Sequence, residues 1–325
     1  MLLHYRLLPG RKKYIFLRTQ ILHETNEPGG LVIARVFPSR TEFIPTDKHA
    51  YFDVPGYLTP QYDEIHISTT FTWDVPHANW LAQQWMKHGK IILGGPAFND
   101  PCNGEFEPGK YIRLGCVFTS RGCPNHCWYC LVPKREGAIR ELKIHDGNFI
   151  MDNNLLACSE KHLSEVFKML SDKRGINFNQ GLEAKRITKD IGFELQKLKY
   201  KVIWLAYDRP GDYYQVLRAY VRLGKPKHKT YCYVLSGYRG DTPQKAEDRC
   251  MKLAKAGIYP FMMLYQPAKL TGRTGWNQPN QPDEPDGKTR YSKEWRNLQR
   301  KWTRPAAWKS FMNPKPNINK ELNFR

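Results

Sequence analysis

The sequence lacks a hydrophobic run long enough to cross a membrane. No apolar stretch within its 325 residues approaches the roughly 18 residues that a membrane-spanning helix needs. The first residues, MLLHYRLLPG, interrupt a short apolar stretch with His4 and Arg6, so they do not read as a secretory signal peptide. These two absences predict a cytoplasmic protein with no membrane partner.

Acidic residues are also scarce. The chain has 31 Asp and Glu against 51 Lys and Arg, which gives a formal net charge of +20. Such a charge favours polyanionic partners, of which RNA or DNA is the simplest, although a basic surface that only keeps the protein in solution fits as well. A hydrophobic fraction of 41% excludes a chain that is disordered throughout.

Eight cysteines are too few for a disulfide framework in a chain of this length. Three of them, Cys123, Cys127 and Cys130, follow the pattern C-x3-C-x2-C, which indicates metal or redox chemistry in a reducing compartment. Free cysteine otherwise packs as a small apolar residue. We therefore expect one metal centre, and mostly packing roles for the isolated Cys102, Cys116, Cys158, Cys232 and Cys250.

Short strand-like runs alternate with turns in the first 110 residues. Runs rich in β-branched or aromatic residues fall at 13–17, 31–37, 64–68 and 90–95. Between the last two, Asp74 or Pro76 begins a predicted helix that Gly89 ends, with a stripe of Trp80, Leu81, Trp85 and Met86. Strand, helix and strand in succession predict a βαβ unit with a small parallel sheet.

After a Gly-, Pro- and Asn-rich linker at 94–110, strands and helices alternate regularly. The predicted strands are 111–118, 147–154, 176–181, 201–208, 229–238 and 258–265. Ser159 is expected to cap the first long helix, which buries Leu163, Val166, Phe167 and Leu170. Later helices are expected at 189–200, 212–224 and 241–257. This alternation predicts right-handed parallel crossovers, and thus a barrel or half-barrel.

Residues 269–325 form a basic extension beyond the alternating region. A polar, Pro-rich linker at 277–288 precedes a predicted basic helix at 290–311 that carries Trp295, Leu298, Trp302 and Trp308. The tryptophans fit two roles: docking onto the preceding domain, or stacking platforms for a single nucleic-acid strand. We favour docking, because their helical spacing is that of a buried face.

Three thiolates on one loop leave a metal centre one ligand short. Cys123, Cys127 and Cys130 can bind three irons of a [4Fe–4S] cluster, and the fourth iron then stays open to a ligand that is not protein. Catalytic metal centres keep such an open position, whereas structural ones close it. A zinc site of the three cysteines with His126 is the alternative, but a histidine adjacent to Cys127 suits a common tetrahedral geometry poorly.

The cysteine loop resembles the signature of the radical S-adenosylmethionine (SAM) superfamily. Members share C-x3-C-x2-C with an aromatic residue before the last cysteine, the position of Tyr129, and the loop follows the first barrel strand. The resemblance implies a partial (βα)6 TIM-like barrel at 111–268, and a cluster whose unique iron binds the amino and carboxylate groups of SAM. It also implies reductive cleavage of SAM to a 5′-deoxyadenosyl radical, and an external one-electron donor such as flavodoxin or ferredoxin.

The same resemblance suggests residues that contact SAM, Tyr129 among them. Superfamily members often carry Gly-Gly-Glu at the end of the second strand. Here Asp152, Asn153 and Asn154 stand there and resemble the Asp-Asp-Asn of cobalamin-type members. Asp152 suits a cationic ammonium, although Asp and Asn are also common in ordinary turns.

Two further segments, FNQGLEAKRIT and WLAYDRP, resemble NQGLDxR and AFDNP segments of a poorly characterised branch of the superfamily. They follow the third and fourth predicted barrel strands, at the edge where the site of a barrel lies. This resemblance adds Gln180, Glu183, Arg186 and Asp208 as candidates for contact with SAM. Arg186 suits a carboxylate, and Asp208 suits a ribose hydroxyl or a substrate amine.

Residues 1–110 resemble the Rossmann-like domain that precedes the barrel in cobalamin-dependent members. Cobalamin binding there uses Asp-x-His-x-x-Gly, but the nearest string here, DKHAYF at 47–52, lacks the glycine and precedes no predicted helix. We therefore interpret His49 as a loop histidine and expect no bound cobalamin.

The predicted architecture is α/β, with a small Rossmann-like domain at 1–110, the partial barrel at 111–268 and the basic extension at 269–325. The predicted function is that of a radical SAM enzyme with one [4Fe–4S] cluster, which acts on a nucleic acid, a peptide or a small metabolite. The alternative is a nucleic-acid-binding protein with a structural zinc or a catalytically idle cluster.

Overall fold

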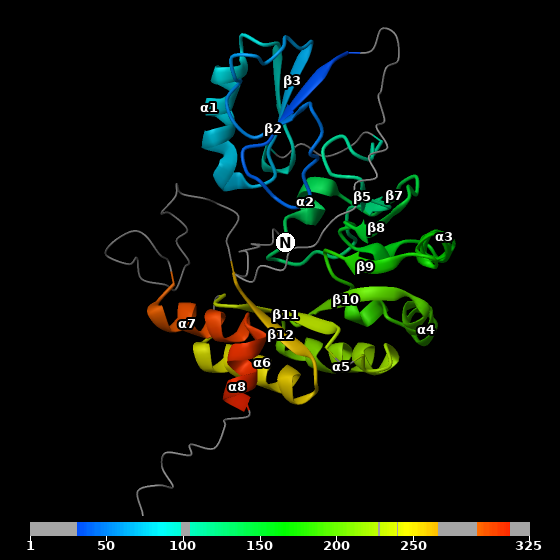
Figure 1. Cartoon of the computed structure of the whole chain (residues 1–325). Helices are drawn as coiled ribbons and strands as arrows, with labels where there is room; N and C mark the ends of the chain where they lie inside the picture. Colours follow the sequence, from blue (N-terminus) through cyan, green and yellow to red (C-terminus); the bar gives the residue numbers. More distant parts are fainter. Residues whose placement is uncertain (1–30, 99–104, 227, 239, 266–290, 313–325) are drawn as a thin grey trace, which may run out of the picture. The chain divides into compact units, whose positions relative to one another are not determined.

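Two parallel sheets carry the fold, one in each of two units of the chain, 1–101 and 102–325 (Figure 1). The computed structural model describes residues 31–98, 105–226, 228–238, 240–265 and 291–312. The predicted strand at 13–17 and the linker at 277–288 lie outside these ranges. Within them, no helix combines the length and the apolar character that crossing a membrane requires.

Within residues 31–98, the first unit holds four parallel strands in the order β2-β1-β3-β4. They are β1 (Ile33–Val36), β2 (Ala50–Tyr51), β3 (Glu64–Ser68) and β4 (Lys90–Gly94), and helix α1 (Val75–Trp85) connects the last two. Alternation along β3 buries Ile65 and Ile67 completely. The predicted βαβ unit is confirmed, whereas β2 was not expected, since two residues are too short for a visible alternation.

The stripe predicted for α1 is partly wrong. Leu81 and Trp85 are fully buried, but Trp80 is 45% exposed and Met86 is 63% exposed. The buried face is Ala78, Leu81 and Trp85, which keeps the three- and four-residue spacing of one helix side. The helix also ends earlier than predicted.

His49 lies in the loop before β2, as predicted. Its Nδ1 is 3.2 Å from the hydroxyl of Tyr62, which precedes β3 in the same way. Both side chains therefore stand at the amino edge of the parallel sheet. Ligands of open α/β sheets bind at the opposite, carboxyl edge.

Where the structure describes it, the second unit holds a sheet of six parallel strands in the order β5-β8-β9-β10-β11-β12. They are β5 (Gly115–Val117), β8 (Gly147–Ile150), β9 (Arg174–Phe178), β10 (Lys199–Ala206), β11 (Thr230–Ser236) and β12 (Tyr259–Leu264). The six predicted strands are thus confirmed, and their spatial order follows the chain, as a partial barrel requires. In the described residues the sheet stays open, with β5 and β12 at its edges, so the barrel itself stays a prediction.

Four helices connect the strands along one side of this sheet (Figure 1). They are α3 (Glu160–Leu170), α4 (Lys189–Lys197), α5 (Tyr213–Arg222) and α6 (Pro243–Lys255). Ser159 caps α3 by accepting a hydrogen bond from the His162 amide. The predicted stripe of α3 is confirmed, because Leu163, Val166, Phe167 and Leu170 all belong to the core.

Three of the isolated cysteines belong to the core of the second unit. Cys116, Cys232 and Cys250 are fully buried, which confirms their packing roles. Cys158 is half-buried, and Cys102 lies outside the described residues.

The described part of the basic extension, 291–312, folds as two helices, α7 (Lys293–Trp302) and α8 (Pro305–Met312), where one was predicted. The first helix ends before Pro305, because proline lacks the amide hydrogen that a helix interior needs. Proline is tolerated in the first turn, so a new helix begins there. Trp295, Trp302 and Trp308 are at most 5% exposed and join the core of the second unit. Docking of the tryptophans is therefore confirmed.

Replacement of Trp302 should destabilise the second unit strongly. The side chain is fully buried, so Trp302→Ala should lower the free energy of unfolding by about 3–5 kcal/mol. Urea denaturation followed by circular dichroism measures the change. Phe193→Ala on α4 is the control, because its ring is 60% exposed and its loss should cost little. Equal effects of the two substitutions would contradict a docked extension.

Candidate functional site

The three-cysteine loop leaves the sheet after β5 and is closed at its base by a short antiparallel pair. Strands β6 (Ser120–Arg121) and β7 (Arg140–Glu141) pair on either side of it, and helix α2 (Val132–Glu136) lies between. The Cys123 amide donates to the Gly137 carbonyl at 3.2 Å. Gly122 has a φ of +86°, and a Cβ there would lie 2.0 Å from the Ala138 carbonyl oxygen. Glycine is thus required at the neck of the loop.

Glu136 is a residue of this site that the sequence analysis missed. Its side chain is completely buried, and its carboxylate lies 3.0 Å from Arg135, 3.8 Å from Arg121 and 4.0 Å from Arg140. A buried carboxylate is stable only when cations or donors surround it. The run KREGAIRE carries two acidic residues and three basic ones, but nothing in that composition shows which of them is buried.

Cys123, Cys127 and Cys130 are half-buried free thiols on this loop. Burial raises the pKa of the Cys127 thiol, an effect that a hydrogen bond with Tyr129 partly offsets. A thiol of this kind releases its proton when a metal takes its place. The donor set of three sulfurs fits a [4Fe–4S] cluster, in which each thiolate binds a different iron.

The zinc alternative finds no support in the geometry. Among the described residues, no three His, Cys, Asp or Glu side chains approach closely enough to hold a single metal ion. His126, the fourth ligand of the proposed zinc site, is exposed on the loop. A zinc site needs all four ligands within about 2.0–2.3 Å of one point.

Three consecutive residues at the end of β8 hold the entrance of the loop. The buried Asp152 carboxylate accepts from the Thr119 amide at 2.7 Å, from the Thr119 hydroxyl at 2.6 Å and from the Ser120 hydroxyl at 2.7 Å. Burial raises the pKa of Asp152, and these hydrogen bonds counteract the rise. The side chain of Asp152 thus binds the chain just before the cysteines.

The next two side chains reach the loop itself. Asn153 accepts a hydrogen bond from the Gly122 amide at 3.0 Å. Asn154 Nδ2 lies 3.4 Å from the Cys123 sulfur and donates to Glu183 at 2.7 Å. Its Oδ1 is buried and has no hydrogen-bond partner among the described residues. Asn154, which lies beside Cys123, therefore has a buried oxygen that can accept a further hydrogen bond.

Glu183, after β9, is the centre of a second group of contacts. Its carboxylate accepts from Asn125 of the cysteine loop at 2.9 Å, and it pairs with Lys185 and Arg186 at 2.7 Å each. Burial alone would raise the pKa of Glu183, but the hydrogen bonds from Asn154, Lys185, Asn125 and Arg186 lower it below its usual value. The group is therefore an anion that orients two cations next to the cysteines. Gln180 is half-buried in the turn after β9, outside these contacts.

Asp208, after β10, meets the cysteine loop through Tyr129. The Tyr129 hydroxyl donates to Asp208 Oδ2 at 2.6 Å. Burial raises the pKa of Asp208 from 3.8 to about 6, although the bond from Tyr129 acts against the rise. Oδ1 of Asp208 is buried and has no well-oriented hydrogen-bond partner in the described residues. The nearby Leu235 amide also acts against the rise of the pKa.

The structure thus gathers most of the predicted site residues at the carboxyl edge of one parallel sheet. Tyr129, Asp152, Asn153, Asn154, Glu183, Arg186 and Asp208 contact the cysteine loop directly or through one residue. Trp128 was missed, although it is the aromatic residue between two predicted positions. Its ring lies against Tyr238 and Tyr265, with centroids 5.7 and 5.0 Å away.

Comparison with known proteins points to a fold without identifying a family. The sequence matches no model of a known protein family, and it matches no curated protein. The structure is similar to TsrM from Kitasatospora setae, a radical S-adenosylmethionine methyltransferase solved with cobalamin and a [4Fe–4S] cluster. The TM-score is 0.53 at 10% identity, over 71% of this chain and 74% of that one.

A second TsrM structure, with tryptophan substrate and the SAM analogue aza-SAM bound, gives a TM-score of 0.50. The identity is again 10%, over 72% of each chain. At this identity the likeness shows the fold alone. This chain therefore has a mixed α/β fold with parallel sheets that is similar to the fold of TsrM.

The raised pKa of Asp208 predicts a pH dependence of stability. The folded protein holds the Asp208 proton more tightly than the unfolded chain, so this group stabilises the fold most below pH 3.8. That contribution should disappear as the pH rises to about 6, with a loss on the order of 3 kcal/mol relative to Asp208→Asn. Urea denaturation of both proteins without added iron, at several pH values, measures the difference. Parallel pH profiles of the two proteins would contradict it.

Proposed function

We propose that this protein is a radical SAM enzyme with one [4Fe–4S] cluster bound by Cys123, Cys127 and Cys130. The observation that carries the proposal is the placement of these cysteines. They lie on a loop at the carboxyl edge of a six-stranded parallel sheet, and polar residues from the ends of the next three strands converge on it. The cluster, when bound, supplies the electron that cleaves SAM reductively to a 5′-deoxyadenosyl radical.

The protein's own residues bind and orient the cofactors. Asn154 Oδ1 and Asp208 Oδ1 are buried acceptors, and they suit the ammonium or ribose hydroxyls of SAM. Lys185 and Arg186, oriented by Glu183, suit a carboxylate. Asp152 already accepts three hydrogen bonds, so in this proposal it positions the loop and does not itself meet the ammonium.

The similar fold supports a partial (βα)6 barrel for the second unit and a Rossmann-like remnant for the first. Cobalamin is left out of the proposal. The histidine nearest to a cobalamin motif, His49, stands at the amino edge of its sheet and bonds to Tyr62. An external one-electron donor such as flavodoxin or ferredoxin completes the proposed system in the cytoplasm.

The substrate proposal rests on charge. A net charge of +20 supports RNA or DNA as substrate. Binding of a labelled RNA or DNA strand should then weaken steeply as salt rises, because cationic side chains displace condensed counterions. An absence of binding even at low salt would remove nucleic acid from the proposal and leave a peptide or a small metabolite.

The first experiment is anaerobic reconstitution with iron and sulfide, followed by dithionite, SAM and chromatography for 5′-deoxyadenosine. The wild type should turn brown and form the product. Cys127→Ala should lose the cluster, and product formation should fall to background. Cys250→Ala is the matched control, because that buried cysteine on α6 belongs to the core and should be dispensable.

Each alternative gives a different result in this experiment. A colourless protein that binds zinc stoichiometrically would overturn the proposal in favour of a nucleic-acid-binding protein. A brown wild type whose product formation is equal in Cys127→Ala would also contradict it, because the cleavage would then not depend on this loop.

Glu183→Gln should weaken SAM binding. The substitution removes the anion that orients Lys185 and Arg186, and a charge-assisted hydrogen bond contributes about 1.5–3 kcal/mol. Calorimetry on the reconstituted protein should therefore show a Kd raised by roughly tenfold or more. Glu194→Gln is the control, since Glu194 pairs with Lys197 on the exposed side of α4. Unchanged affinity in Glu183→Gln would exclude the role assigned to these cations.

A further inference from the structure

Trp128 contacts residues that follow β11 and β12, the last two strands of the sheet. It stands between Cys127 and Tyr129, and 54% of its surface is exposed. Its ring nevertheless contacts Tyr238, just after β11, with centroids 5.7 Å apart, and Tyr265, just after β12, with centroids 5.0 Å apart. The 127–130 segment is therefore in contact, through Trp128, with the residues that follow these two strands.

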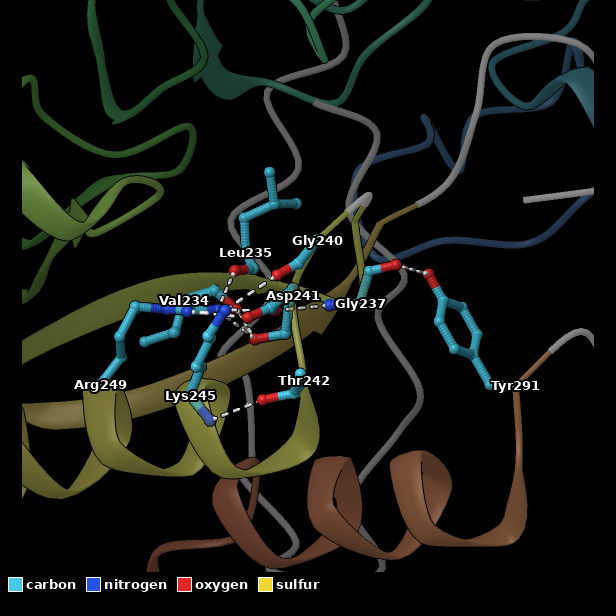
Figure 2. Close-up of polar contacts among 10 residues, drawn as sticks. Val234, Leu235, Gly237, Gly240, Asp241, Thr242, Lys245, Arg249 and Tyr291 are labelled. Atoms are coloured by element: carbon cyan, nitrogen blue, oxygen red, sulfur yellow. Dashed lines mark hydrogen bonds and ion pairs between the residues drawn. The ribbon is translucent and has the colours of Figure 1, made fainter. Parts of the chain in front are cut away.

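Tyr291, from the basic extension, binds the ends of both strands. Its hydroxyl donates to the Tyr265 carbonyl at 2.6 Å and lies 3.3 Å from the Gly237 carbonyl. Figure 2 shows the ring reaching toward Gly237 from the start of α7. The side chain is buried and packs against Trp295 of α7. The Tyr291 hydroxyl thus binds the backbone of Tyr265 and of Gly237, the residue before Tyr238.

Gly237 is shaped for this contact. Its φ is +73°, and a Cβ at this position would lie 2.6 Å from Cε1 of Tyr291. Gly240, three residues later, has a φ of +81° but faces open space. Replacement of either glycine should therefore strain the backbone, but only a side chain at position 237 would collide with Tyr291.

A buried ion pair fixes the loop between them. Arg249 of α6 donates to both oxygens of Asp241, at 3.0 and 2.8 Å, and to the Leu235 carbonyl at 2.9 Å (Figure 2). Asp241 in turn accepts from the Gly237 amide at 2.9 Å. Arg249 and Asp241 thus bind the Leu235 carbonyl and the Gly237 amide, while Tyr291 binds the Gly237 carbonyl.

We propose that Tyr291 is a positioning residue for the cluster-binding segment. By fixing the ends of β11 and β12, it holds Tyr238 and Tyr265 against Trp128, and through Trp128 it restrains Cys127 and Cys130. The assignment of that segment to a cluster rests on the proposed function, but the mechanical link from Tyr291 to Trp128 does not. The basic extension therefore takes part in building the site.

Hydrogen exchange followed by mass spectrometry tests the link in the full-length protein without added iron. Tyr291→Phe removes the hydroxyl and keeps the ring, so exchange in peptides that cover 127–131 should accelerate roughly fivefold, the effect of one ordinary hydrogen bond. Peptides of α3 should not change. Tyr220→Phe is the control, since that hydroxyl binds the Gly257 carbonyl on another part of the unit.

The glycine pair gives a second test of the same link. Gly237→Ala should accelerate exchange at 127–131 because the new methyl displaces Tyr291, whereas Gly240→Ala should leave it unchanged. In a Trp128→Ala background, Tyr291→Phe should have no further effect on this segment, since the connecting ring is gone. Exchange at 127–131 that matches the wild type in Tyr291→Phe, or that rises uniformly across the unit, would overturn the proposal.

Reconstitution separates this inference from the proposed function. The reduced cluster of Tyr291→Phe should show an altered electron paramagnetic resonance spectrum at equal iron content, while Tyr220→Phe should match the wild type. A wild type that binds no cluster would overturn the proposed function and leave the exchange result standing. A wild type with a cluster, together with a Tyr291→Phe variant identical in spectrum and exchange, would overturn the inference alone.

Discussion

The hydrogen bonds between the end of β8 and the chain that enters the cysteine loop are the interaction on which the site depends. Asp152 is buried, and Thr119 and Ser120 donate hydrogen bonds to both of its carboxylate oxygens. A buried charged acceptor without donors costs more than the 1–3 kcal/mol or so of a neutral one, so each side holds the other in place. Because Asn153 and Asn154 follow directly, the same contact also fixes the amides that reach Gly122 and Cys123.

Cations gather at two places beside the cysteine loop. Arg121, Arg135 and Arg140 gather around Glu136 at its base, and Lys185 and Arg186 gather around Glu183 at its side. In both groups the cations outnumber the carboxylate, so a positive charge remains near the cysteines. Part of the +20 charge of the chain thus has a local use, independent of any nucleic acid.

The sequence predicted those features whose physical cause is local. The six strands of the second unit and the cap at Ser159 follow from alternation and from one hydroxyl. The exposure of Trp80 and the burial of Glu136 depend on how the chain packs around them, so the spacing of residues in the sequence does not show them. The resemblance to radical SAM proteins found the cysteines and their strand-end neighbours. It could not find Trp128 or Tyr291, because their roles come from contacts between strand ends and a separate extension.

The open edge of the second sheet explains why that extension belongs to the site. In a closed barrel the last strand pairs with the first, but β12 pairs only with β11 in the described residues. An edge strand needs protection, and here α7 packs against β12 while Trp308 meets Tyr259 at its start. The helices that cover the edge also bring Tyr291 to the end of β12, beside Tyr265. Stability of the edge and placement of the cysteines are therefore two results of the same packing.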